Sequence, residues 1–339
     1  MARFLVLRLL QLVGVLLVVS AIVFFSLRLG PFDPAGQAYE ATLGDPKRLA
    51  ELRAYWGLDR PLTEQYGKYL WGLLHGDLGK SLQDLQPVSR AIGNRLPATI
   101  ELAVVSTLLG TLLGLAVGVL SAYKLNTWVD LAGRSAALVG ISFPTFWLGV
   151  MGVAIFAVKL QWLPSGGRFS EDVSFEPTTG FYLLDGILQR RLDVLMTALE
   201  HLLLPAAVLG LLVAGLVTRI VRAAMLEALG KDYVRTALAK GTTSRRAVLW
   251  HALPNALLPI ITVVGLMFGL LLSGAVIVET VFAYPGMGKL LVDSISVRDF
   301  AQVQACILVL ATIYSLVNAA ADVLYAVVDP RVRLESGVV

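Results

Sequence analysis

The sequence predicts an all-α integral membrane protein whose chain crosses the bilayer six times. Hydrophobic residues make up 57% of the 339 positions and charged residues only 15%, whereas about 25% of the residues of a soluble domain are charged. Six stretches are apolar over the roughly 20 residues that a helix needs to cross a hydrocarbon core of about 30 Å. None shows the alternation over about ten residues that is typical of a transmembrane β-strand.

The six predicted spans are 9–29, 100–123, 131–158, 201–221, 254–280 and 302–328. They are apolar on all sides, as suits helices that face lipid or the interior of a bundle. The first follows Arg3 and Arg8 and could be a signal peptide, but its uncharged run exceeds the roughly 7–15 residues that are usual for one. We therefore expect it to be retained as the first helix.

The distribution of basic residues predicts that both termini lie in the cytoplasm. With that orientation, thirteen Lys and Arg residues fall in the cytoplasmic segments and six in the two shorter outer connections, in agreement with the positive-inside rule. The net charge of +4 is small against 28 basic and 24 acidic residues. Nothing in this balance indicates binding to nucleic acid.

This topology divides the chain into four parts. Residues 1–29 form an N-terminal transmembrane helix, and residues 30–98 form an external cap that is too charged to span the membrane and too apolar to be disordered. Residues 99–330 form a core of five helices, which includes a cytoplasmic connection at 219–253. Residues 331–339 are a cytoplasmic tail.

Side chains for catalysis or metal binding are scarce. Cys306 is the only cysteine, which argues against a thiolate metal site or a redox pair, and the three histidines are widely separated, which argues against a histidine-rich metal site. No Ser–His–Asp or HExxH arrangement occurs. We therefore expect the chain itself not to be an enzyme and to hold no metal or cofactor.

Several residues inside the predicted spans are candidates for a gate or a transport pathway. Prolines in the third, fourth and fifth spans are expected to kink these helices, because proline removes a backbone donor. Ionisable residues are costly in the membrane and are functional candidates by default, although Glu101 and Glu279 could lie at the interface and Asp322 could bond Asn318. The pathway candidates are Pro144, Pro205, Pro259, Glu279 and Asp322.

The cytoplasmic connection is expected to form two short helices at the membrane surface. The connection begins with Arg219 and Arg222, the break falls at 241–244, and a second short helical stretch, 245–253, ends in Pro254. Glycine at such a break can adopt a positive φ without a steric cost.

This connection resembles the cytoplasmic loop of ABC importer permeases. That loop has Glu-Ala-Ala, three further residues and a glycine, and nine residues later Ile, any residue, Leu and Pro. Arg235 and His251 stand where the general pattern has Glu and Ile, and both departures are similar to the dipeptide, oligopeptide and nickel branch. The residues that match at the family's spacing are Ala237, Gly241, Leu253 and Pro254.

The resemblance to dipeptide-type members of this branch covers nearly the whole chain. Further similar segments are 57–62, 76–81, 279–288 and 329–333. The resemblance implies an ATPase-coupling loop that includes Asp232, Tyr233, Arg235, Thr236, Ala237, Lys240, Gly241, His251, Leu253 and Pro254.

The resemblance also implies a type I ABC importer permease fold with six transmembrane helices and an external helical cap. The chain would be the permease subunit of an importer of dipeptides or short peptides in a bacterial inner membrane. It would pair with a second homologous permease as a heterodimer and dock on two cytoplasmic ATPase subunits that bind ATP and Mg. A periplasmic or lipid-anchored binding protein would deliver the substrate, and the chain would contact membrane lipid.

Other functions remain as alternatives. The same architecture could import nickel chelates, glutathione or haem. An ion-coupled secondary transporter would show pseudo-repeated halves and paired buried ionisable groups at the midplane, and neither signature is visible in the sequence. A purely structural membrane protein would not need the loop around Gly241.

Overall fold

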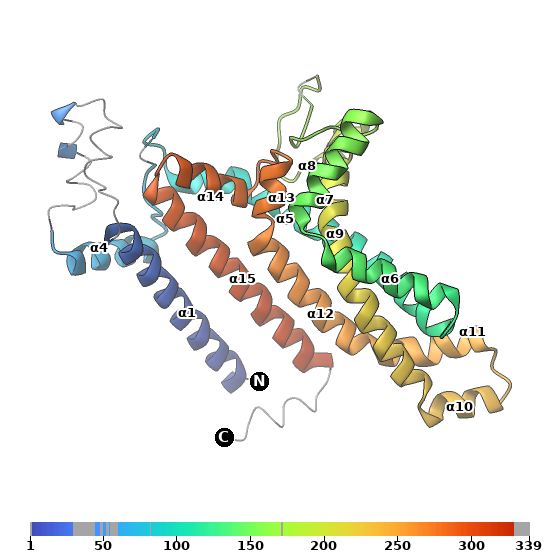
Figure 1. Cartoon of the computed structure of the whole chain (residues 1–339). Coiled ribbons are helices and arrows are strands. Elements are labelled where there is room, and N and C mark those ends of the chain that lie inside the picture. The colour runs from blue at the N-terminus through green and yellow to red at the C-terminus, as the bar shows by residue number, and fades with distance from the viewer. Residues whose placement is uncertain are drawn as a thin grey trace.

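The computed structural model of this chain describes residues 2–29, 45–47, 50–51, 54, 60–81, 83–170 and 172–328. These residues form helices joined by turns and by longer connections at 75–87 and 160–181 (Figure 1). The described part has no β-strand, and an isolated bridge joins Lys80 to Pro87. The predicted all-α class is confirmed. The predicted tail and residues 30–44 of the predicted cap lie outside the described residues.

The elements are, in chain order, α1 (Ala2–Leu29), α4 (Leu62–Leu74), α5 (Val88–Tyr123), α6 (Trp128–Ser142), α7 (Thr145–Gly152), the π-helical η1 (Val153–Lys159), α8 (Tyr182–Leu188), α9 (Leu192–Leu229), α10 (Asp232–Ala239), α11 (Ser244–Arg246), the π-helical η2 (Ala247–Ala252), α12 (Leu253–Gly274), α13 (Val276–Val281), α14 (Met287–Ser296) and α15 (Phe300–Val328).

Four of the described helices, α1, α5, α9 and α15, are long and apolar enough to cross a membrane. Two bent pairs of helices raise the number to six if each pair is one span. One pair is α6 with the continuous segment of α7 and η1, and the other is Ser244–Leu257 with Pro259–Ser273. The structure therefore supports several membrane crossings, and the count of six stays a prediction.

The third predicted span is not a single kinked helix. α6 and the helical segment that begins at Thr145 meet at an angle of 100°. Phe143 has an extended backbone with φ −82° and ψ 133°, because the ring of the following proline disfavours the helical conformation at the preceding residue. Pro144 therefore ends one helix and starts the next.

Two of the long helices extend beyond the predicted spans. α5 begins at Val88 and contains Pro97, and α9 runs from Leu192 to Leu229. These extensions carry charged residues such as Arg90 and Glu227, so hydropathy does not detect them as part of a span. α5 extends past its predicted span only at the start, whereas α9 extends past its predicted span at both ends.

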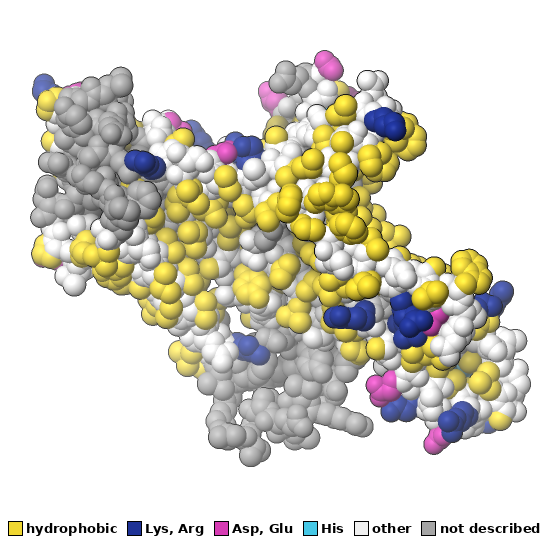
Figure 2. Space-filling view, viewed as in Figure 1, with side chains coloured by type: hydrophobic (Ala, Val, Ile, Leu, Met, Phe, Trp, Pro, Cys, Tyr) yellow, Lys and Arg dark blue, Asp and Glu magenta, His cyan; other side chains and the backbone are white. Residues whose placement is uncertain are grey.

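Hydrophobic side chains cover the middle of the face shown in Figure 2, and charged side chains lie mainly toward the two ends of the long helices. Many large apolar side chains are exposed on these helices, for example Leu10 (63%), Leu108 (56%) and Leu138 (66%). An apolar surface of this extent is stable only against lipid or other apolar helices.

Close packing of α5 against α9 forms the centre of the structure. Glycines at 110, 114 and 118 of α5 share one helix face, and each faces a valine of α9. A Cβ atom added at Gly114 would lie 2.7 Å from Val217 Cβ and 2.9 Å from the Ala214 carbonyl oxygen. The two backbones can approach this closely only because Gly114 has no side chain.

Gly114→Ala should therefore destabilise the protein, since overpacking of this kind costs roughly 1–3 kcal/mol. Gly93→Ala is the matched control on α5, because a Cβ there meets nothing within 4 Å and alanine favours the helix by about 1 kcal/mol. Thermal unfolding in detergent should show a lower midpoint for Gly114→Ala only. Equal midpoints for both variants would contradict the packing argument.

Candidate functional site

The connection at 219–253, predicted to be cytoplasmic, forms a compact unit at the end of α9 where α10 and α11 lie (Figure 1). α10 begins at Asp232, and an acidic residue in the first turn favours the helix dipole. Val234 is 1% exposed and packs in the same core cluster as Met225 of α9 and Val248 of η2. α10 is thereby held on the helices beside it by an apolar anchor.

Gly241 ends α10 with backbone hydrogen bonds that are typical of a Schellman motif. Its N–H donates to the Leu238 carbonyl (2.9 Å), and the Thr242 N–H donates to the Ala237 carbonyl (3.1 Å). Gly241 has φ +89°, a conformation that residues with a Cβ rarely adopt. The predicted break with a positive φ is confirmed, and it sets the direction of the chain toward α11.

The sequence predicted that the second helical stretch of the connection ends at Pro254. In the structure the helix continues past this residue. α11, η2 and α12 follow one another without a break, and Pro254 lies in the first turn of α12. In a regular α-helix its ring would clash with the carbonyl of residue i−4, which is Trp250. Trp250 lies in the wider π-helical turn of η2, and such local widening lets a helix accommodate proline.

The coupling residues predicted from the sequence lie together on this unit, and most are exposed. Asp232, Tyr233, Arg235, Thr236, Lys240, Gly241 and Pro254 are exposed, and Ala237, His251 and Leu253 are half-buried. Trp250 is also 73% exposed, although the sequence did not single it out. This surface offers a charged strip on α10 beside an apolar indole of η2.

A buried ion pair holds the C-terminal part of α9 to α6. Asp130 is fully buried, and Arg222 donates to it from Nε (2.7 Å) and Nη2 (2.9 Å). The Asn126 N–H also donates to Asp130 (3.2 Å), and Arg134 Nε lies 3.5 Å away. A bidentate pair of this kind fixes the relative orientation of both side chains, so α6 and the start of the cytoplasmic connection are linked directly.

Glu279 lies in a closed site at the opposite end of the molecule. It is fully buried on α13, and the Thr99 hydroxyl donates to its Oε1 (2.7 Å) while the Lys289 N–H donates to its Oε2 (3.0 Å). Thr99 in turn accepts a hydrogen bond from the Met287 N–H (2.7 Å). The carboxylate therefore joins α5, α13 and α14.

A second buried ion pair lies near that end, between Glu101 of α5 and Arg168 of the segment 160–191. Arg168 Nη2 lies 2.8 Å from Glu101 Oε2, and each side chain is 6% exposed. Arg168 also donates to the Gly180 carbonyl (2.7 Å), and the Leu183 N–H donates to Glu101 (2.7 Å). These bonds attach the segment to α5, so Glu101 is a structural partner within the protein.

The other pathway candidates are dispersed in the structure. Pro144 lies at the 100° break, and Pro259 begins the second member of a pair bent by 54°. Pro205 is buried inside α9, which continues through it. Asp322 lies on α15, but its side chain is outside the described residues, as is any bond to Asn318. The structure does not bring these candidates to one site.

Sequence reasoning did not single out Asp130, Arg222 or Arg168 as buried partners. Their partners are far away in the chain, and no periodic pattern links the members of each pair. Asp130 had one usable signal, because an acidic residue directly beside an apolar span is costly unless it is paired.

Comparison with known proteins shows the family. Residues 114–334 match the family described as the binding-protein-dependent transport system inner membrane component. Residues 1–103 match the family described as its N-terminal membrane component. Together, the two matches cover most of the chain.

Curated relatives match over nearly their whole length. A dipeptide transport system permease protein of Alkalihalophilus pseudofirmus is 40% identical over 326 residues, which are 96% of this chain and 98% of that protein. A probable D,D-dipeptide transport system permease protein of Escherichia coli is 45% identical over 329 residues, 96% of each chain. A dipeptide transport system permease protein of Escherichia coli is 43% identical over 291 residues, 85% of this chain and 86% of that protein. The chain belongs to the family of binding-protein-dependent transport system inner membrane components and is a multi-pass membrane protein.

Proposed function

We propose that this chain is the permease subunit of an ATP-driven importer of dipeptides or short peptides. The observation that supports the proposal is the unit of α10, Gly241, α11, η2 and the start of α12, which carries the predicted coupling residues and leaves most of them exposed. The peptide permease relatives support the substrate class, because they align over most of the chain.

The cytoplasmic unit is suited to act as a lever. α10 is anchored by Val234, its exit is directed by Gly241, and α11 continues through η2 into α12. A force on α10 would thus reach α9 directly and α12 through the continuous helix. Arg222 and Asp130 would transmit the same movement to α6.

The energy would come from other subunits. We propose that two cytoplasmic ATPases bind ATP and Mg and that each docks on a permease, with this chain and a second homologous permease forming a heterodimer. A periplasmic or lipid-anchored binding protein would deliver the substrate at the opposite end. The family name itself describes a binding-protein-dependent system.

We place the chain in a bacterial inner membrane with both termini and α10 in the cytoplasm. The positive-inside rule supports this orientation, because basic residues gather at Arg219, Arg222, Arg245 and Arg246 around the connection. The region around α4 would then face outward.

Labelling of single cysteines tests this orientation. In a Cys306→Ala background, Glu64→Cys on α4 should react with an impermeant thiol reagent in cells with a permeable outer envelope. Thr243→Cys should react only after the inner membrane is opened. The reverse pattern, or equal labelling of both positions in intact cells, would refute the proposed orientation.

Substitutions of Gly241 test the lever. Gly241 has φ +89°, and the space that a Cβ atom would occupy there is open, so backbone strain alone should decide the outcome. Asparagine tolerates this conformation, alanine less well, and a β-branched residue least. Substrate uptake and substrate-stimulated ATP hydrolysis in reconstituted vesicles should fall together. The loss should be smallest for Gly241→Asn, larger for Gly241→Ala, and roughly tenfold or more for Gly241→Val.

Gly76→Val is the matched control for strain at a positive φ. Gly76 has φ +76° and equally open surroundings, but it follows α4 at the other end of the molecule. Gly76→Val should reach the membrane in similar amounts and retain coupling between ATP hydrolysis and uptake. Normal uptake by Gly241→Val at wild-type abundance would remove the loop from the mechanism.

Arg222→Lys tests the link between α6 and the connection. Lysine keeps the charge but cannot form the bidentate contact with Asp130, so we expect substrate-stimulated ATP hydrolysis to fall several-fold at near-normal abundance. Arg134→Lys is the matched control, because Arg134 approaches the same carboxylate through one atom at 3.5 Å and is half exposed. Equal effects of the two substitutions would argue that the bidentate contact has no special role.

A further inference from the structure

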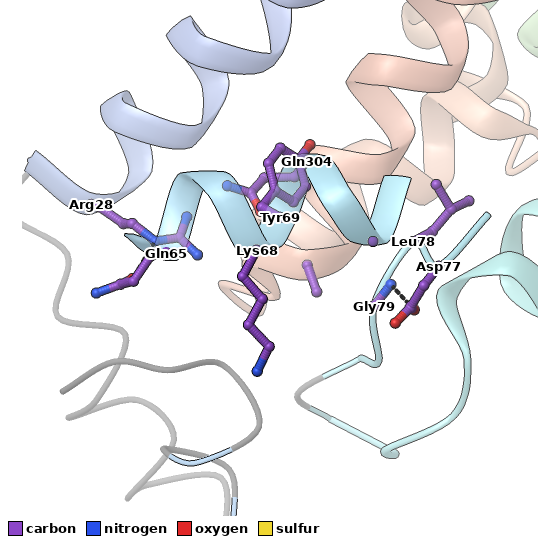
Figure 3. A pocket seen from close by; sticks show the side chains of 10 residues that line it. Arg28, Gln65, Lys68, Tyr69, Asp77, Leu78, Gly79 and Gln304 are labelled. Atoms are coloured by element: carbon purple, nitrogen blue, oxygen red, sulfur yellow. Dashed lines mark hydrogen bonds between the residues drawn. The ribbon is translucent and has the colours of Figure 1, made fainter. Parts of the chain in front are cut away.

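Two hollows lie side by side between α1, α4 and α15, away from the coupling unit. The first, which we call the polar hollow, has a volume of about 120 Å³ and a mixed lining whose polar and charged side chains include Arg28, Gln65, Lys68, Tyr69, Asp77 and Gln304 (Figure 3). The Asp77 carboxylate accepts a hydrogen bond from the Gly79 N–H (2.9 Å). The second has a volume of about 410 Å³ and an almost wholly apolar lining. Leu78 lines both hollows, so they adjoin each other.

The polar hollow is rich in hydrogen-bond donors. Arg28 lies in the last turn of α1, and its Nε donates a hydrogen bond to the Gln65 side chain (3.1 Å). The central carbon of its guanidinium group lies 3.7 Å from the centre of the Phe24 ring. The bond of Arg28 to Gln65 uses Nε, and the bond to the Phe24 carbonyl uses Nη1. The third nitrogen, Nη2, takes part in neither of these two bonds. Lys68 adds a second cation to the same lining.

Two buried polar groups of the same lining have no hydrogen-bond partner among the described residues. They are the Tyr69 hydroxyl and the Gln304 side-chain nitrogen, and Gln304 is only 5% exposed. Burial raises the pKa of Tyr69 to about 12, so its hydroxyl keeps its proton at neutral pH. Buried donors without a partner are costly, and an oxygen-rich anion in the hollow would satisfy both.

The apolar hollow has the chemistry of an acyl-chain site. Its lining comes from three helices: Val13, Leu16 and Leu17 of α1, Leu70, Leu73 and Leu74 of α4, and Leu308 and Val309 of α15, with Leu78 beside them. Ser20 and Thr312 also line it, but the Ser20 hydroxyl is bonded to the Tyr66 hydroxyl (2.9 Å) and Thr312 donates to the Leu308 carbonyl (2.7 Å). The hollow therefore offers little to a polar ligand.

The two hollows lie at the depth of a membrane surface and of the acyl chains next to it. The apolar span of α1 ends at Leu29, one residue after Arg28. Trp71 and Leu74 of α4 are 66% and 81% exposed, as suits an amphipathic helix at the boundary between headgroups and acyl chains. α4 turns Gln65 and Lys68 toward the polar hollow and Leu70 and Leu74 toward the apolar one.

We propose that this pair of hollows binds one phospholipid with an anionic headgroup. Its phosphate would accept hydrogen bonds from Arg28, Tyr69 and Gln304 with Lys68 nearby, and one acyl chain would fill the space between α1 and α15 below α4. A free phosphate would leave the apolar hollow empty. A helix of another protein would fill the apolar hollow but would need an acidic or amide side chain to satisfy these donors.

The proposed lipid would stabilise the position of α1. Among the described helices α1 packs mainly against α15, and most of its large side chains are exposed. A lipid that contacts all three helices would hold α1 and α4 on α15. The proposal does not depend on the transported substrate or on the ATPases.

Lipid retention by the purified transporter tests the proposal. The full assembly is incorporated in bilayers that contain equal amounts of phosphatidylglycerol and phosphatidylcholine, extracted in mild detergent and analysed by native mass spectrometry. Wild-type protein should retain about one phosphatidylglycerol at this site. Arg28→Gln should reduce its apparent affinity roughly tenfold or more, since the lost bonds are charge-assisted, and Arg28→Lys should restore part of it.

Matched controls separate this site from lipid that surrounds the whole protein. Arg8→Gln makes the same change at the other end of α1 and should leave retention unchanged. Leu308→Trp should displace the lipid by filling the apolar hollow, whereas Leu316→Trp on the exposed side of the same helix should not.

Three outcomes would overturn the proposal. The first is that phosphatidylcholine is retained as well as phosphatidylglycerol, and the second is that Arg8→Gln and Arg28→Gln lose equal amounts of lipid. The third is that Leu16→Cys cross-links to another subunit in the intact assembly. Retention is measured without substrate or ATP, so failure of peptide transport would leave this test unaffected.

Discussion

The close approach of α5 and α9 is the constraint on which the rest of the structure depends. Lipid is as apolar as the helices, so helices in a membrane associate through close packing and polar contacts rather than through the hydrophobic effect. The glycines at 110, 114 and 118 allow Val213, Val217 and Val221 to pack directly on the backbone of α5. The other core helices and the cytoplasmic unit are positioned against this pair.

Polar contacts extend the pair at both of its ends. At the end that leads to α10, Arg222 follows the last of these valines and binds Asp130 of α6. At the other end, Thr99 of α5 binds Glu279, and Glu101 binds Arg168. Each contact joins α5 or α9 to a segment that is distant in the chain. These two helices therefore anchor the neighbouring segments at both ends of the core.

The sequence was sufficient to predict the features that depend on local composition. The apolar spans, the all-α class and the positive φ at Gly241 follow from runs of hydrophobic residues and from the properties of glycine. The 100° bend at Pro144 and the π-helical turn before Pro254 are local responses to a proline ring, but hydropathy does not give their geometry. The pair Glu101–Arg168 could not be predicted, because it depends on how the segment 160–191 folds back on α5.

The placement of buried charge also bears on how transport would be driven. Among the described residues, the buried carboxylates Glu101 and Asp130 are each paired with an arginine, and Glu279 is bonded by a hydroxyl and a backbone N–H. Two further buried carboxylates, Asp185 and Asp299, accept hydrogen bonds from nearby backbone N–H groups. Glu101, Asp130 and Glu279 lie near the ends of the long helices and join segments of one chain. An ion-coupled mechanism would need ionisable groups near the midplane that exchange partners. In the proposed importer, these contacts would instead hold the core helices together while a force acts on the exposed unit around Gly241.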